Sequence, residues 1–220
     1  MSTLEERPHE GHLVTLTDPA APAAEAYRAL ASSIRFGASA QMARSLLVTS
    51  AGQGEGKSTT VANLAVTAAQ SGAKVIAIDC NLHQPALHRL FGLPNSDGIS
   101  TSLSAEYLEA VPLQPGPTPG LQILVAGPTP PTPSQLLGSA RFDEVVALLR
   151  EKADMILIDS PALESAADAI LMAPRVDGVL LLISANHTRR DAAQRARDRL
   201  ARVQARVVGT VLVNAPTRRG

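Results

Sequence analysis

The sequence predicts an α/β protein with a doubly wound, mainly parallel sheet and helices on both faces. Apolar runs of strand length alternate along the chain with segments that have the apolar periodicity of helices. One of these runs, at residues 45–50, leads into a glycine-rich turn and then into a helical pattern from Ser58 to about Gln70. Ligands of such sheets bind at the carboxyl ends of the strands, so we expect the functional site in the turns that follow the strands.

The turn after residues 45–50 predicts a binding site for a nucleoside triphosphate. It reads Ala51-Gly-Gln-Gly-Glu-Gly-Lys-Ser-Thr59, which departs from the phosphate-loop pattern only where Ala51 replaces the first glycine. The alternating glycines would let backbone N–H groups face a polyphosphate, while Lys57 would reach its β- and γ-phosphates and Ser58 would ligate Mg²⁺. A bare glycine-rich surface loop leaves these glycines unexplained, and a dinucleotide fingerprint needs glycine where Lys57 stands. We therefore predict a P-loop NTPase whose nucleotide-binding residues include Gly52, Gln53, Gly54, Glu55, Gly56, Lys57, Ser58 and Thr59.

Composition limits the size of the protein and its partners. With 220 residues and 45% hydrophobic content, the chain suits one sizeable α/β core, and its formal net charge of +0 gives no overall case for nucleic acid. The single cysteine, Cys80, excludes an internal disulfide. Neither a signal peptide nor an apolar run of the roughly 20 residues that span a bilayer is evident. We expect a cytoplasmic protein with a flexible arm at 1–20, one P-loop domain at 21–216 and a short tail at 217–220.

The other expected elements alternate between strand and helix. The amphipathic pattern at Ala23–Phe36 predicts a helix that covers the core or contacts another subunit. The proline-rich stretch 94–133 predicts long loops around a single strand near 121–126. The last helix is expected to open at Thr188 with a pattern like a capping box. The remaining expected elements are strands at 74–79, 155–159, 177–184 and 206–213 and a helix at 134–152.

Polar residues close three of the expected strands, at the edge where nucleotides bind. Asp79 follows the apolar run that begins at Lys74, and Asp159 follows the run that begins at Met155. Asp159 is a candidate Walker B carboxylate, which would hold Mg²⁺ through its water shell or orient the attacking group. Asn214 ends the last strand and is a candidate contact for the adenine base.

Two other features do not indicate additional sites. His83 and His88 are five residues apart, which does not place them on one helical face, and no other metal-ligating residue type clusters with them. The arginines of the last helix could suggest nucleic-acid binding. However, two of them follow an aspartate by four positions, an ordinary arrangement on a solvated helix face, so we expect no nucleic-acid partner.

Several segments of the sequence, in a fixed order, match the pattern of a known family. They are Glu25-Ala-Tyr-Arg-Ala-Leu30 with Ile34-Arg-Phe36, the Gly54-Glu-Gly-Lys-Ser58 loop, Asp79-Cys-Asn-Leu-His-Gln-Pro85, Ala126-Gly-Pro-Thr-Pro-Pro-Thr-Pro-Ser-Gln-Leu-Leu137 and Asp159-Ser-Pro161. With these segments, the chain resembles the cytoplasmic domain of bacterial tyrosine kinases (BY-kinases) of the CpsD/CapB-like kind, which are P-loop ATPase relatives of MinD and ParA. The resemblance runs from about Ala20 to Pro216.

The resemblance implies an ATP- and Mg²⁺-dependent protein-tyrosine kinase that regulates the biosynthesis and export of capsular or extracellular polysaccharide. It implies a tyrosine-bearing protein substrate and a membrane-spanning polysaccharide co-polymerase, which activates the kinase and recruits it to the inner face of the membrane. By position, Lys57 would hold the transferring phosphate and Asp79 would be a Walker A′ acid. Glu25 and Arg28 would belong to an E-x-x-R-x-x-R motif that forms a homo-oligomeric ring. The implied catalytic residues are Lys57, Asp79 and Asp159, and the implied metal ligands are Ser58, Asp79 and Asp159.

The chain departs from the family pattern at three positions. Asn81 stands where the family has a second Walker A′ aspartate, His83 stands where it has an arginine, and Ala31 replaces the third charged residue of the ring motif. The chain contains only two tyrosines, Tyr27 and Tyr107, so the family's C-terminal tyrosine cluster is missing.

These departures keep a second function open. Asn81 and the missing tyrosines favour a catalytically weak or inactive nucleotide switch, which would serve as a scaffold in a membrane polysaccharide complex. A third function, that of a partitioning or positioning ATPase, is disfavoured because Gly52 stands where the MinD and ParA group has a signature lysine.

Overall fold

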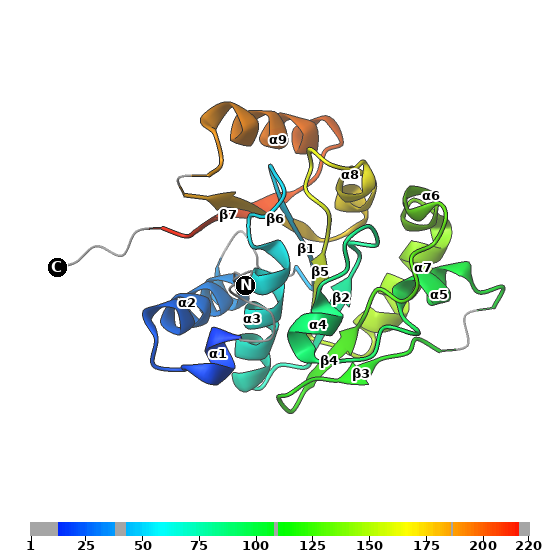
Figure 1. Ribbon diagram of the computed structural model, residues 1–220, viewed down its shortest axis with the longest axis horizontal. Helices are drawn as coiled ribbons and strands as arrows, with labels where there is room; N and C mark the ends of the chain where they lie inside the picture. The colour runs from blue at the N-terminus through cyan, green and yellow to red at the C-terminus, as the bar shows by residue number, and fades with distance from the viewer. Residues whose placement is uncertain (1–12, 38–42, 108–109, 186, 216–220) are drawn as a thin grey trace, which may run out of the picture.

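The computed structural model describes residues 13–37, 43–107, 110–185 and 187–215, and within them a single seven-stranded sheet carries helices on both faces (Figure 1). The strand order is β3-β4-β2-β5-β1-β6-β7, and every neighbouring pair is parallel except β3 with β4. The strands are β1 Ser45–Ser50, β2 Val75–Asp79, β3 Gln114–Pro115, β4 Leu121–Leu124, β5 Met155–Asp159, β6 Gly178–Ser184 and β7 Val207–Val213. The doubly wound, mainly parallel fold is therefore confirmed.

The helices connect these strands. They are α1 Val14–Thr17, α2 Pro22–Phe36, α3 Lys57–Gln70, α4 Leu87–Phe91, α5 Ile99–Ser104, α6 Pro133–Leu137, α7 Ala140–Arg150, α8 Asp168–Met172 with the 3₁₀ turn η1 Ala173–Arg175, and α9 Arg190–Arg202. No helix in the described part of the chain is long and apolar enough to cross a membrane.

The core consists of two apolar layers, one on each face of the sheet. Leu46 and Val48 of β1 belong to the layer that contains residues of α2 and α3, whereas Leu47 belongs to the layer of α7 and α9. All six residues of β1 are buried. A strand covered on both faces has no solvent side, which explains why the apolar runs in the sequence are continuous and do not alternate with polar residues.

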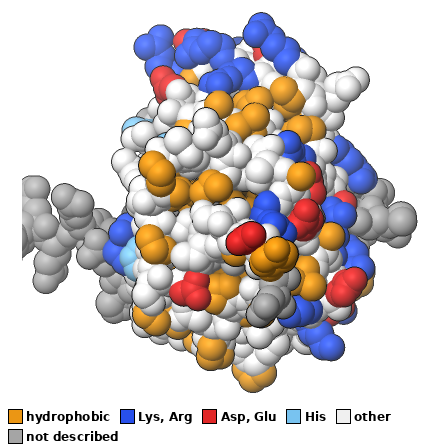
Figure 2. All heavy atoms as spheres, turned by 90° about the vertical axis from the view of Figure 1, so that its right-hand side faces the viewer, with side chains coloured by type: hydrophobic (Ala, Val, Ile, Leu, Met, Phe, Trp, Pro, Cys, Tyr) orange, Lys and Arg blue, Asp and Glu red, His pale blue; other side chains and the backbone are white. Residues whose placement is uncertain are grey.

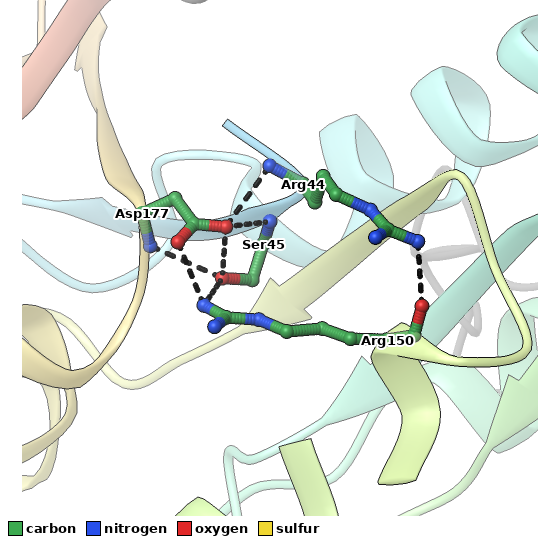
Figure 3. Close-up of polar contacts among 4 residues, drawn as sticks. All are labelled: Arg44, Ser45, Arg150 and Asp177. Carbon is green, nitrogen blue, oxygen red and sulfur yellow. Dashed lines mark hydrogen bonds and ion pairs between the residues drawn. The ribbon is translucent and has the colours of Figure 1, made fainter. Parts of the chain in front are cut away.

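At the amino end of β1, a polar cluster joins three elements (Figure 3). Asp177, which precedes β6, accepts hydrogen bonds at Oδ2 from the backbone N–H groups of Arg44 and Ser45, at 3.0 and 2.8 Å, and from the Ser45 hydroxyl at 2.9 Å. Its Oδ1 accepts from the guanidinium of Arg150, the last residue of α7, at 2.7 Å. This end of the sheet is thus fixed by a carboxylate whose two oxygens both have donors.

The folded domain begins earlier in the chain than the sequence predicts. Of the expected arm at 1–20, residues 1–12 lie outside the described residues, and Leu13 is only 2% exposed. In α1, the backbone N–H and the hydroxyl of Thr15 both donate to Asn63 Oδ1 of α3, at 3.1 and 2.9 Å. A buried polar residue with both donors satisfied belongs to the folded domain, so an arm that extends to residue 20 is wrong for residues 13–17. The expected tail at 217–220 also lies outside the described residues.

The region between β2 and β5 contains more regular structure than predicted. The stretch 94–133 was expected to hold one strand, yet it also holds α5 and the short strand β3. The single helix expected at 134–152 is two helices, because Ser139 has extended backbone angles, φ −79° and ψ 162°, that separate α6 from α7. Neither α8 nor η1 was predicted.

The last helix begins one residue later than the predicted capping box requires. Its N-cap is Arg189, with no side-chain cap, and the Thr188 hydroxyl donates instead to Glu55 in the phosphate loop. Figure 2 shows Lys and Arg side chains gathered at the top of the molecule, the end at which Figure 1 places α9. One of the two expected helical ion pairs is present, Arg195 with Asp191 at 2.8 Å, whereas Asp198 lies near Arg197 at 3.7 Å.

Candidate functional site

The phosphate loop connects the end of β1 to the start of α3. Gly54 and Gly56 have φ angles of +70° and +80°, a left-handed conformation that residues with a Cβ adopt only at a cost. Gly56 is the N-cap residue of α3, and no side chain caps that helix, so its first N–H groups are free to bind phosphate oxygens. The loop predicted from the glycine spacing therefore has the geometry that phosphate binding requires.

Lys57, the first residue of α3, points its ammonium group back toward the end of β1. Its Nζ donates to the Ser50 hydroxyl at 3.1 Å, and the residue is only 8% exposed. Burial lowers the pKa of Lys57, while the nearby carboxylates of Asp159 and Glu55 act to raise it. Lys57 thus places an ammonium group beside the uncapped N–H groups at the start of α3, and the two together can bind a phosphate.

Glu55 joins the phosphate loop to the turn after β6. The side chain is buried, and its Oε1 accepts a hydrogen bond from the Thr188 hydroxyl at 2.6 Å, while the Thr188 oxygen in turn accepts from the backbone N–H of Ser184 at 2.8 Å. The second oxygen of Glu55 is buried without a partner among the described residues. This link is a functional feature that sequence reasoning missed, since Glu55 and Thr188 are 133 residues apart.

Asp79 and Asp159 are neighbours at the carboxyl edge of the sheet. They are paired in the register of β2 and β5, and both are fully buried. Burial, together with the charge of Asp79, raises the pKa of Asp159 to about 8. The nearby Ser58 hydroxyl and Lys57 ammonium oppose this rise. Neither carboxylate oxygen of Asp159 has a hydrogen-bond partner in the described chain.

Asp79 differs from Asp159 because its oxygens are already used by the backbone. Oδ2 accepts from the N–H groups of Ala86 and Leu87, both at 2.9 Å, and Oδ1 accepts from the N–H of Asn81 at 3.1 Å. Burial raises the pKa of Asp79 to about 6, and these N–H groups limit the rise. Asp79 therefore caps the start of α4 and shapes the loop at residues 80–86, a role that the sequence did not indicate.

The residues beside Asp159 fit a Mg²⁺ ion. A carboxylate and a hydroxyl are the oxygen donors that Mg²⁺ prefers, and Asp159 and Ser58 supply them next to the phosphate loop. A buried carboxylate without donors is costly unless a cation or a proton neutralises it. Asp79 fits less well as a direct ligand, because a metal would have to share its oxygens with three N–H groups.

The remaining predicted residues lie around this edge. Asn214 follows β7 with a positive φ of 54°, and its Nδ2 donates to the Ser184 hydroxyl at 3.1 Å, so it sits at the end of β6. Gly52 is partly buried in the loop, and a Cβ at this position would lie 3.3 Å from Glu55 Oε1. His83 makes a contact of 3.0 Å with the buried carboxylate of Asp168.

The three positions of the implied ring motif do not all lie on one face of α2. Arg28 pairs with Glu25 of the same helix at 2.6 Å, and both side chains are exposed. Ala31, at the third position, is 8% exposed and belongs to the apolar layer under α2. The third position therefore faces the core in this chain.

Comparisons with known proteins agree with this geometry. Residues 46–215 match the family model described as the CobQ/CobB/MinD/ParA nucleotide binding domain. The tyrosine-protein kinase YwqD of Bacillus subtilis (strain 168) is 34% identical over 91% of this chain and 85% of its own length. The tyrosine-protein kinase CpsD of Streptococcus agalactiae is 28% identical over 86% of this chain and 82% of its own.

Solved structures of bacterial tyrosine-kinase domains are similar to this chain as well. The kinase domain of the Escherichia coli tyrosine kinase ETK superposes with a TM-score of 0.88 at 28% identity and covers 97% of this chain and 84% of that one. The chimerical protein CapA2B2 superposes with a TM-score of 0.85 at 30% identity, covering 93% and 90%. With a phosphate loop of the required conformation and relatives that match over nearly its whole length, the chain belongs to the bacterial tyrosine-kinase family, within the CobQ/CobB/MinD/ParA nucleotide-binding group.

Proposed function

We propose that the protein is an ATP- and Mg²⁺-dependent protein-tyrosine kinase that regulates the biosynthesis and export of capsular or extracellular polysaccharide. The observation that carries this proposal is the placement of the unpartnered carboxylate of Asp159 near Lys57 of the phosphate loop, in the chain of a tyrosine-kinase family member.

In this proposal, catalysis comes from positioning and charge. The N–H groups at the start of α3 and the ammonium of Lys57 would hold the β- and γ-phosphates, and Asn214 would contact the base. Ser58 and Asp159 would hold Mg²⁺, with Asp79 supporting them, and the ion would neutralise charge on the β- and γ-phosphate oxygens. The substrate tyrosine would attack in line with the leaving ADP oxygen.

The partners that we propose follow from the family. A membrane-spanning polysaccharide co-polymerase would activate the kinase and recruit it from the cytoplasm to the inner face of the membrane, and a tyrosine-bearing protein would be the substrate. Glu25 and Arg28 are exposed on α2 and available for a homo-oligomeric ring. Because Ala31 is uncharged and also buried, it cannot add a third charged contact, so we expect the ring to be weaker than one that has all three charges.

A second candidate function rests on Asn81. An amide in place of a carboxylate cannot accept a proton, which favours a nucleotide-switch scaffold with slow or no turnover. The kinase and the scaffold predict equal binding of ATP and differ only in phosphoryl transfer.

The deciding experiment is incubation of the full chain with labelled ATP, Mg²⁺ and a tyrosine-bearing fragment of the membrane partner, followed by detection of phosphotyrosine. We expect transfer by the wild type and none by Lys57→Ala, which should also bind ATP about tenfold to hundredfold more weakly because it loses a charge-assisted contact of roughly 1.5–3 kcal/mol. ATP binding without any phosphotyrosine would support the scaffold. Unchanged ATP affinity of Lys57→Ala in calorimetry would contradict the nucleotide site itself.

A further inference from the structure

His83 and Asp168 form a hydrogen-bonded pair that none of the roles assigned so far explains. The imidazole Nε2 of His83 lies 3.0 Å from Asp168 Oδ2. The Asp168 side chain is fully buried, while that of His83 is 46% exposed. The Ser134 hydroxyl of α6 donates to the other oxygen of Asp168. The pair therefore consists of a half-exposed imidazole that is hydrogen-bonded to a buried carboxylate.

This arrangement determines which nitrogen of the imidazole can accept a proton. A carboxylate accepts hydrogen bonds, so Nε2 carries the hydrogen that lies toward Asp168, and Nδ1 is left with the lone pair. The buried carboxylate holds the ring in this orientation. A carboxylate and an imidazole in this relation make a general base.

The pair lies at the same edge of the sheet as the phosphate site. His83 is in the loop between β2 and α4, and Asp168 opens α8, which follows the loop after β5 (Figure 1). Within the His83 loop, Cys80 and Leu82 are buried in the core and fix its path. After burial, the charges of Asp79, Asp159 and Asp168 all raise the pKa of the Cys80 thiol, so the three carboxylates lie near one residue of this loop.

The neighbouring Asn81 cannot perform the same task. Its side-chain amide is neutral, and its Oδ1 faces the backbone N–H of Gln84 at 3.3 Å. His83 is thus a side chain of this loop that can accept a proton and is also exposed to an incoming substrate.

We propose that His83 accepts the proton of the substrate tyrosine hydroxyl during phosphoryl transfer, while Asp168 positions its imidazole. This inference rests on the proposed kinase function. The tyrosine oxygen forms a bond to the γ-phosphorus, the bond between that phosphorus and the bridging oxygen breaks with its electron pair going to ADP, and the hydroxyl proton moves to Nδ1 of His83. The resulting imidazolium stays paired with the Asp168 carboxylate until it releases the proton to water.

Two variants of His83 separate proton transfer from a structural role. An arginine can pair with a buried carboxylate but cannot accept a proton, so His83→Arg should keep the loop in place while losing the base. His83→Ala removes both properties. We expect each variant to bind ATP as the wild type does and to transfer phosphate to a synthetic single-tyrosine peptide roughly 10²-fold more slowly or worse.

A more acidic substrate provides the readout that a structural role would not change. The same peptide with 3,5-difluorotyrosine has a hydroxyl that loses its proton far more readily, so it depends less on a base. We expect the deficits of both His83 variants to shrink at least tenfold with this peptide. Asp168→Asn should show a smaller deficit than His83→Ala, with the same relief.

The outcomes are distinct. Transfer by His83→Arg at the wild-type rate overturns the proposal and leaves His83 as a residue that holds its loop. A deficit of equal size on both peptides also overturns it. If the wild type transfers no phosphate to either peptide although it binds ATP, the proposed kinase function fails first, and this inference fails with it.

Discussion

Asp177 and Asp159 are two acidic residues at opposite ends of the same sheet, and their surroundings are opposite as well. At the amino end, Asp177 receives three hydrogen bonds at Oδ2 and one from Arg150 at Oδ1. At the carboxyl end, Asp159 is fully buried beside Asp79 and receives none among the described residues.

The comparison shows how identical side chains can serve the fold or the site. A partly buried carboxylate with donors, such as Asp177, contributes to stability, whereas a fully buried one without donors destabilises the folded state until a cation or a proton neutralises it. We therefore expect a cation to bind at the unpartnered carboxylate of Asp159, whereas the carboxylate of Asp177 joins the sheet to α7. Substitutions at the two ends should separate activity from stability.

The largest effect is expected for Asp159→Asn. The variant loses the negative charge that would hold Mg²⁺, so phosphoryl transfer in the presence of Mg²⁺ and ATP should fall by roughly 10²- to 10⁴-fold. Its folding should be intact, because no described residue donates to the lost carboxylate. Asp177→Asn is the matched control, and measured below its melting temperature it should keep the wild-type rate. A normal rate for Asp159→Asn would remove this residue from the site.

The second effect is on stability. Asp177→Ala leaves the amides of Arg44 and Ser45 without their acceptor and leaves Arg150 with the Ser45 hydroxyl alone, which should cost about 3 kcal/mol of unfolding free energy and lower the melting temperature by about 6–12 °C. Asp143→Ala is the control, since its pair with Arg175 at 3.6 Å is largely exposed and worth less than about 1 kcal/mol. Chemical denaturation measures both variants, and equal losses would contradict the contrast.

The third effect is a dependence on pH. The pKa of Asp159 is raised to about 8, so the folded protein keeps a proton that the unfolded chain releases near pH 4. Stability of the metal-free protein should therefore fall as the pH rises from about 5 to 8, by on the order of 4 kcal/mol from this group. Asp159→Asn should lack this contribution. Thermal melts across this range with a chelator present test it, and parallel profiles for both proteins would refute it.

The smallest effect concerns the link between the phosphate loop and β6. Thr188→Val removes the hydroxyl that donates to Glu55 and accepts from Ser184, and should cost about 1 kcal/mol in stability. ATP affinity should fall with it, because Glu55 belongs to the loop. Thr188→Ser keeps the hydroxyl and should behave as the wild type. If valine and serine give the same melting temperature, the link contributes nothing measurable.

The parts of the fold that sequence predicts well are those that local residue types determine. Continuous apolar runs gave β1, β2, β5 and β6, because strands buried on both faces need apolar side chains at every position. The glycine spacing predicted the phosphate loop, because Gly54 and Gly56 adopt backbone angles that favour glycine. These features depend on a few consecutive residues.

The features that sequence missed depend on distant partners. Thr188 looks like the start of a capping box, yet its hydroxyl donates a hydrogen bond to Glu55, which is far away in the chain. In the sequence, Asp79 and Asp159 look alike, since each ends an apolar run. In the structure their hydrogen bonding differs, because the loop at 80–86 folds back and donates backbone hydrogen bonds to Asp79. The break between α6 and α7 is an exception, because Gly138 ends α6 and Ser139 precedes α7, and this pair is a local stop and start signal that the predicted single helix overlooked.

The two-residue strand β3 has a consequence for how copies of this protein can associate. It lies antiparallel on the outer side of β4, and its Pro115 has no N–H group with which to pair with another strand. At the other end of the sheet, β7 is seven residues long, and its Leu212 is 59% exposed. Within the described residues, the β3 edge of the sheet is thus protected against edge-to-edge aggregation. A strand from another chain would pair more readily with β7.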